Sequence, residues 1–160
     1  MSDKADLLER FRRGPDIIEA AILPVKGAEL DYKPAPGRWT IREIAAHMAD
    51  SEMVSGMRFR QVVAEEKPVI RAYNQDAWAA RLGYQKRDPA ASLETFRRVR
   101  MDTYALLKDL PDAEYTRTGH HSEHGEITLL ELLKIYAEHP EGHVNQVAGV
   151  REAYRTAQNK

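Results

Sequence analysis

The chain has 160 residues, of which 24 are lysine or arginine and 25 are aspartate or glutamate, so its formal net charge is -1. This length suits a single domain over residues 1–160 that buries an apolar core of its own. The balanced charge argues against a dedicated nucleic-acid-binding protein. Because the chain contains no cysteine, disulfides, a cysteine-based zinc site and a protein thiolate nucleophile are excluded.

The sequence also argues against a membrane protein. No apolar run approaches the roughly 20 residues that a bilayer-spanning helix requires. The N-terminal segment MSDKADLLER lacks the apolar core of a signal peptide. We therefore expect a cytoplasmic protein whose partners are neither membranes nor nucleic acids.

Glycine and proline divide the chain into four long segments in which apolar residues recur at helical spacing. Gly14 and Pro15 interrupt the first segment, so we expect a kink or a restart there. Asp88 before Pro89 is typical of an N-cap followed by proline in the first turn of the third segment. Helices are thus expected over residues 3–23, 40–66, 89–110 and 128–154, with a short helix over 74–82.

Two of the helix starts carry a capping box. Thr40 with Glu43, and Thr128 with Glu131, each place a hydroxyl and a carboxylate where they satisfy unpaired backbone amides. The stretch over residues 116–125 is polar and turn-rich, and no segment shows the alternation of a β-strand. The sequence therefore predicts an all-α four-helix bundle. Its long connection between helices 2 and 3 indicates a topology other than up-down-up-down.

Three histidines fall inside the expected helices. His139 and His143 are four residues apart, so on a regular helix their imidazoles project from one face. His47 can supply a third ligand from a facing helix, and three histidines with a free fourth position are typical of a catalytic zinc site. Imidazole also suits nickel, iron and copper. The alternative interpretation is ordinary packing, because histidine pairs at this spacing also arise by chance.

Three sequence patterns occur in a defined order along the chain. Residues 39–52, WTIREIAAHMADSE, fit the pattern W-[ST]-x-x-E-x-x-x-H-x-x-D-x-E, and residues 139–146 fit H-x-x-x-H-x-x-Q. Between them, His121 and the segment GEITL over residues 125–129 fit H-x-x-x-G-x-x-T-L at the start of the last helix. In order and spacing these patterns resemble the DinB-like superfamily, and the resemblance covers nearly the whole chain.

The resemblance implies a fold, a cofactor and a range of reactions. The fold is a four-helix bundle, commonly dimeric, with a divalent metal held by three histidines that here fall on His47, His139 and His143. Zinc or nickel is the metal we expect, and a homodimer is the expected assembly. The implied activity is metal-dependent transfer of a low-molecular-weight thiol to a small-molecule substrate. Hydrolysis is possible with the same ligands, and no further catalytic residue is identified.

Pro140 separates the two paired histidines, where the family usually carries an acidic or polar residue. A proline inside a helix removes one backbone hydrogen bond and crowds the carbonyl of Tyr136, at a cost of about 3 kcal/mol or more. It also biases His139 away from helical geometry. The segment His139–His143 further lacks the glutamate of the H-E-x-x-H motif of zinc proteases. The alternative function is therefore a non-catalytic stress-response or binding module with a degenerate metal site.

Candidates for contact with a substrate are Trp39, Asp50, His121 and Gln146. Trp39, like Trp78, is a large aromatic of the kind that lines pockets, but a hydrophobic staple at the helix start explains Trp39 equally well. Asp50 is placed either to orient a ligating imidazole or to pair with an arginine such as Arg58. Gln146, one turn after the last histidine, either contacts a ligand or packs between helices.

Other charged and histidine-rich segments favour a structural interpretation. The basic run over residues 97–100 is flanked by acidic residues and is expected to form a solvated helix face. Glu52 is expected to have no role at the site. His120, His121 and His124 are expected to be solvated loop residues, with His121 partly packed, in preference to a second metal site.

Overall fold

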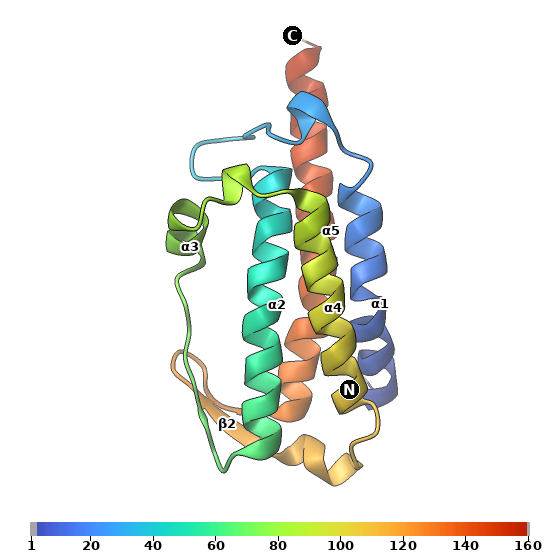
Figure 1. The fold of residues 1–160 in the computed structure, drawn as a ribbon, viewed down its shortest axis with the longest axis vertical. Helices are drawn as coiled ribbons and strands as arrows, with labels where there is room; N and C mark the ends of the chain where they lie inside the picture. Colours follow the sequence, from blue (N-terminus) through green and yellow to red (C-terminus); the bar gives the residue numbers. More distant parts are fainter. Residues whose placement is uncertain (1–2, 160) are drawn as a thin grey trace.

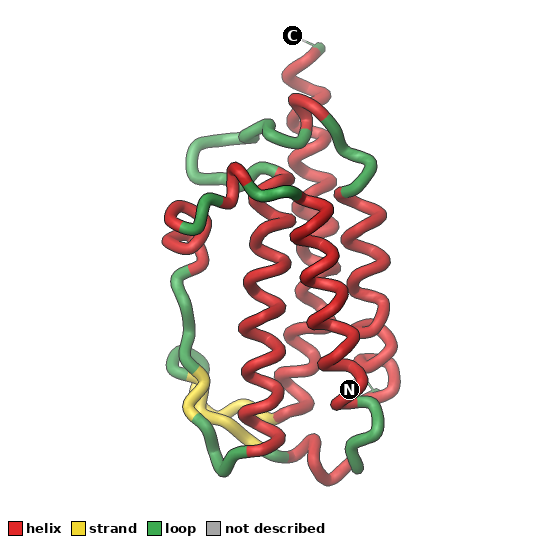
Figure 2. Tube along the Cα trace, in the orientation of Figure 1, coloured by secondary structure: helices red, strands yellow, loops and turns green. Residues whose placement is uncertain are grey.

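The computed structural model describes residues 3–159, in which four long helices form a bundle (Figures 1 and 2). The long helices are α1 (Lys4–Ile22), α2 (Ile41–Ala64), α4 (Pro89–Leu107) and α5 (Leu129–Gln158). Short elements in the connections are the helix α3 (Gln75–Arg81), three 3₁₀ turns, and the strands β1 (Val69–Ile70), β2 (Thr118–His121) and β3 (Gly125–Thr128). The predicted four-helix bundle is confirmed. No helix in this part of the chain combines the length and apolarity needed to cross a bilayer.

The order of the helices in space differs from their order in the chain. α1 packs against α4 and α5, and α2 packs against the same two helices. In Figure 1, α1 and α5 run upward whereas α2 and α4 both run downward. The connection between α2 and α4 therefore crosses the whole length of the bundle, and it carries β1 and α3 along the side of α2. The expected departure from up-down-up-down topology is confirmed.

The helix starts follow the local sequence signals. The Thr40 hydroxyl accepts a bond from the Glu43 amide, and a Glu43 carboxylate oxygen accepts one from the Thr40 amide, at 3.1 and 2.8 Å. Thr128 and Glu131 form the same capping box. Of the kink or restart expected at Gly14-Pro15, the restart is wrong, because α1 continues through both residues.

The prediction that the chain contains no strands is wrong. β2 pairs antiparallel with β3, and β1 pairs parallel with β2. These strands have two to four residues, too few for an alternating pattern, and β1 pairs with residues about 50 positions further along the chain. Gly119 in β2 admits the side chain of Ile70, since a Cβ at this glycine would lie 2.9 Å from Ile70 Cδ1. The sheet lies at the end of the bundle where α2 ends and α5 begins (Figure 2).

The bundle interior has an apolar cluster toward each end and a polar layer between them. Representative members are Phe11, Phe59 and Leu133 in one cluster, and Ile22, Ile44 and Phe96 in the other. Along each helix, the positions between the clusters include Gly14-Pro15 on α1, Glu52 on α2, Arg100 on α4 and His139-Pro140 on α5. This polar layer contains the candidate site.

Candidate functional site

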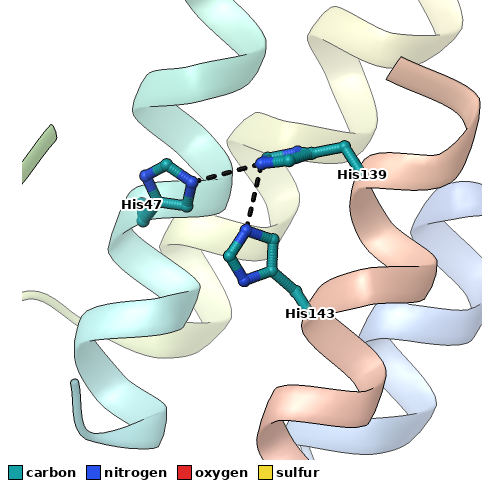
Figure 3. A group of neighbouring side chains, drawn as sticks. All are labelled: His47, His139 and His143. Atoms are coloured by element: carbon teal, nitrogen blue, oxygen red, sulfur yellow. Dashed lines mark hydrogen bonds between the residues drawn. The ribbon is translucent and has the colours of Figure 1, made fainter. Parts of the chain in front are cut away.

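Three histidine side chains from two helices converge in the polar layer (Figure 3). Nε2 of His47 on α2 lies 3.2 Å from Nε2 of His139 on α5, and Nε2 of His143 lies 3.0 Å from the same His139 atom. One ligand atom from each residue lies within 4.8 Å of the other two. The structure therefore brings together the three predicted ligands, although 92 residues separate His47 from His139.

The donor set fits a divalent metal ion. A tetrahedral ion with Zn–N distances of about 2.0–2.1 Å holds its nitrogen ligands roughly 3.3 Å apart, close to the two spacings observed. A neutral imidazole carries a single N–H, yet Nε2 of His139 faces two other ring nitrogens at hydrogen-bonding distance. A shared cation satisfies all three lone pairs, which hydrogen bonds among the rings cannot do.

The surroundings keep the imidazoles in the form that binds metal. Burial, with a smaller effect of the neighbouring His143, lowers the pKa of His47 to about 3. Burial also lowers the pKa of His139 well below its usual value, and the adjacent His143, His47 and Arg100 act in the same direction. For His143 burial lowers the pKa, opposed by its bond to Gln146. Neutral imidazoles do not need to lose a proton before binding a cation.

Pro140 does not disperse the paired histidines. α5 continues from Leu129 to Gln158 with this proline inside it, and the imidazoles on either side still converge. The proline ring packs toward α1, where a Cβ on Gly14 would lie 3.0 Å from Pro140 Cγ. The imidazoles converge around Pro140 because a glycine on the facing helix leaves room for the ring.

A cavity of about 430 Å³ opens onto the histidine cluster. His139, His143, Trp39 and Gln146 line it together with residues 37–38 and 75–76, which come from the loop before α2 and the start of α3. The Trp39 ring also packs on His47, with ring centroids 4.7 Å apart. Two of the four candidate substrate contacts, Trp39 and Gln146, are thus at the site.

The other two candidates lie elsewhere. Asp50 is buried and accepts a 2.6 Å bond from Arg87, and Nδ1 of His47 has no partner among the described residues. Asp50 therefore does not orient His47. His121 is buried in β2, where its ring stacks on His124 at 4.7 Å between centroids. Residues 3–159 hold no second group of potential ligands that satisfies the same proximity as the three-histidine cluster.

A buried ion pair lies in the same layer and corrects one expectation. Arg100 is fully buried, and its Nε and Nη2 each donate a 2.7 Å bond to Glu52, which is also fully buried. Its third nitrogen, Nη1, donates to the Phe11 carbonyl at 3.0 Å, and the guanidinium lies over the Phe11 and Phe96 rings. The solvated face expected for residues 97–100 is wrong at Arg100. The spacing of Arg100 four residues after Phe96, on the apolar stripe, was the signal for its burial.

Comparison with known proteins is consistent with this geometry. The sequence profile of the DinB superfamily matches residues 10–147. YfiT of Bacillus subtilis, provisionally named a metal-dependent hydrolase, is 32% identical over 134 residues, which cover 83% of this chain and 75% of YfiT. OB0782 of Oceanobacillus iheyensis, provisionally named in the same way, is 29% identical over 136 residues, covering 85% of this chain and 78% of that protein.

A solved structure extends the similarity to the fold. YfiT from Bacillus subtilis, described as "a probable metal-dependent hydrolase with an unusual four-helix bundle topology", superposes with a TM-score of 0.87 at 28% identity. The match covers 95% of this chain and 89% of that structure. The chain belongs to the DinB superfamily.

Proposed function

We propose that this chain is a metal-dependent hydrolase of a small-molecule substrate. His47, His139 and His143 hold one divalent ion, zinc or nickel, in this proposal. The observation that carries it is the convergence of three imidazole nitrogens beside a cavity of about 430 Å³. The provisional names of the relatives support hydrolysis.

Each residue of the site has a role that follows from its position. An ion held by the three imidazoles would supply Lewis-acid chemistry, polarising a substrate oxygen and lowering the pKa of a bound water molecule. Trp39 packs on His47, with the two rings tilted by 50°, and keeps bulk water away from this side of the imidazole. Gln146 fixes the orientation of His143 through a 2.8 Å contact. Arg38 and Asp76 at the cavity wall supply charges of both signs for a polar substrate.

The sequence left two other functions open: transfer of a thiol, and a non-catalytic binding module. Transfer of a thiol would use the same ligands, with the sulfur supplied by a small molecule because the chain has no cysteine. A non-catalytic module with a degenerate site was suggested by Pro140, and the convergence of the histidines around this proline favours the enzyme. A homodimer, expected from the family resemblance, remains part of the proposal.

The test compares metal-free and metal-loaded protein. Chelated protein is reloaded with zinc or nickel and assayed on a panel of small esters and amides, beside His139→Ala and, as a matched control, the exposed His120→Ala. The proposal expects turnover that needs metal, disappears in His139→Ala and persists in His120→Ala. Metal-independent turnover, or metal-dependent conjugation of a thiol without hydrolysis, would overturn it.

A further inference from the structure

A second cavity, of about 540 Å³, lies along α2 and is lined by other residues than the histidine pocket. One wall comes from α2 and the other from the connection that crosses the bundle. Its apolar lining consists of Met53, Val54, Met57, Val69 and Trp78. We call it the α2 cavity. Its volume lies within the range of small-molecule sites, and methionine side chains adapt readily to different ligand shapes.

The α2 cavity contains arginine side chains without a carboxylate partner. Arg58 donates to the Tyr136 hydroxyl at 2.9 Å and to the Arg71 carbonyl at 2.7 Å, and both acceptors are uncharged. Its Nε is buried and has no acceptor among the described residues. Within residues 3–159, neither Arg58 nor Arg71 lies within 4.0 Å of a carboxylate oxygen.

The acidic residue of the cavity is already neutralised. Asp50 accepts a 2.6 Å bond from Arg87 and is buried, with 6% of its side chain exposed. The cavity therefore carries a net positive charge between apolar walls. A cation that is partly removed from water and unpaired costs free energy, and an anion placed beside it offsets that cost.

We propose that the α2 cavity binds a small molecule that carries one anionic group on an apolar body. The anionic group pairs with the guanidinium of Arg58, and the body packs against the methionines and Trp78. A carboxylate and a phosphate monoester share this chemistry. Tyr136 connects Arg58 to the histidine cluster: its hydroxyl accepts a bond from Arg58, and its ring centroid lies 6.3 Å from that of His139.

Binding is measured by titration calorimetry on metal-free protein with three probes of equal chain length: octanoate, octyl phosphate and 1-octanol. One equivalent of octanoate or octyl phosphate is expected to bind, and the tighter of the two identifies the anion. The neutral 1-octanol should bind at least about tenfold more weakly, since a hydrogen bond to a charged group contributes 1.5–3 kcal/mol or roughly 10- to 100-fold. Because no metal is present, the outcome is independent of the proposed hydrolysis.

Variants locate the anion. Arg58→Gln should weaken binding of the anionic probe about tenfold or more and leave 1-octanol unchanged. Arg60→Gln is the matched control, because Arg60 lies on the same helix, outside the α2 cavity, and pairs with Asp102. Arg71→Gln provides a second test if Arg58→Gln does not fold, and His139→Gln should bind the anionic probe like wild type.

Several outcomes would overturn the inference. They include equal affinity for octanoate and 1-octanol, or wild-type affinity of a folded Arg58→Gln. Binding of several equivalents without saturation would show partition onto the surface. Failure of every probe to bind would also overturn the inference. This includes the case in which a second copy of the chain blocks the cavity by covering the exposed Met57.

Discussion

The side-chain oxygen of Gln146 lies 2.8 Å from Nδ1 of His143. An amide oxygen only accepts hydrogen bonds, so this contact places the single proton of a neutral His143 on Nδ1. Nε2 is then left with a free lone pair, 3.0 Å from Nε2 of His139. Gln146 therefore positions a candidate metal ligand, in the way that acceptors beside metal-bound histidines commonly do.

Loss of this acceptor should weaken metal binding. Gln146→Leu is expected to lower zinc affinity about 10- to 100-fold, measured by competition with a chromophoric chelator. Gln146→Glu should retain the affinity, because a carboxylate also accepts from Nδ1. Asn145→Ala, at the neighbouring exposed position, is the control. Wild-type affinity of Gln146→Leu would show that Gln146 does not position the ligand.

The buried pair of Glu52 and Arg100 should make a large difference to stability when only one partner is removed. Arg100→Met leaves the Glu52 carboxylate buried and unpaired, and should cost about 3–5 kcal/mol in the free energy of unfolding by urea. Adding Glu52→Leu should recover much of this loss. Arg98→Met, at an exposed arginine on the same helix, should have little effect. An equally small effect of Arg100→Met would contradict the observed burial.

Gly14 should be required for close packing of the polar layer. A Cβ at this position would lie 2.8 Å from Arg100 Nη1, which cannot move freely because it donates to the Phe11 carbonyl. Gly14→Ala is therefore expected to cost about 1–2 kcal/mol of unfolding free energy, the strain exceeding the gain in helix propensity. Gly149→Ala, in α5 with nothing within 4 Å of the added Cβ, should instead stabilise the protein slightly. Stabilisation by both changes would contradict this account.

The stability of the metal-free protein should fall in mildly acidic solution. The pKa of His47 is lowered from 6.5 to about 3, so below pH 6.5 the unfolded chain binds a proton that the folded chain does not. The stabilisation present above pH 6.5 is lost progressively toward pH 3, at up to about 1.4 kcal/mol per pH unit for each such histidine.

This pH dependence is measured by urea unfolding between pH 7.5 and 5.5, a range in which ordinary carboxylates titrate little. His47→Gln should reduce the slope, whereas His120→Gln at an exposed position should retain it. Stability that is constant or that rises as the pH falls would contradict the burial of neutral imidazoles.

Features encoded by neighbouring residues could be predicted from the sequence. Thr40 and Glu43 define a helix start between them, and the spacing of His139 and His143 places two imidazoles on one face once a helix forms. His47 was proposed as a third ligand from a facing helix, and the family resemblance assigned the same residue. The three-histidine cluster therefore depends on the helical periodicity of α5 and on one contact between α2 and α5.

Features that depend on distant partners could not be predicted in this way. The strand over Val69–Ile70 exists because residues 120–121 pair with it. The burial of Arg100 depends on Glu52 on another helix, and the tolerance of Pro140 depends on a glycine of α1. In each case the local pattern indicated a different structure because the compensating group lies far away in the sequence.

The most direct test of the account is the metal content of untagged protein purified without chelators, determined by elemental analysis beside His139→Ala and His120→Ala. We predict one zinc or nickel ion per chain in the wild type and in His120→Ala, and none in His139→Ala. A wild-type protein that contains no metal after incubation with zinc and nickel, or a His139→Ala variant that retains a full equivalent, would contradict the three-histidine site.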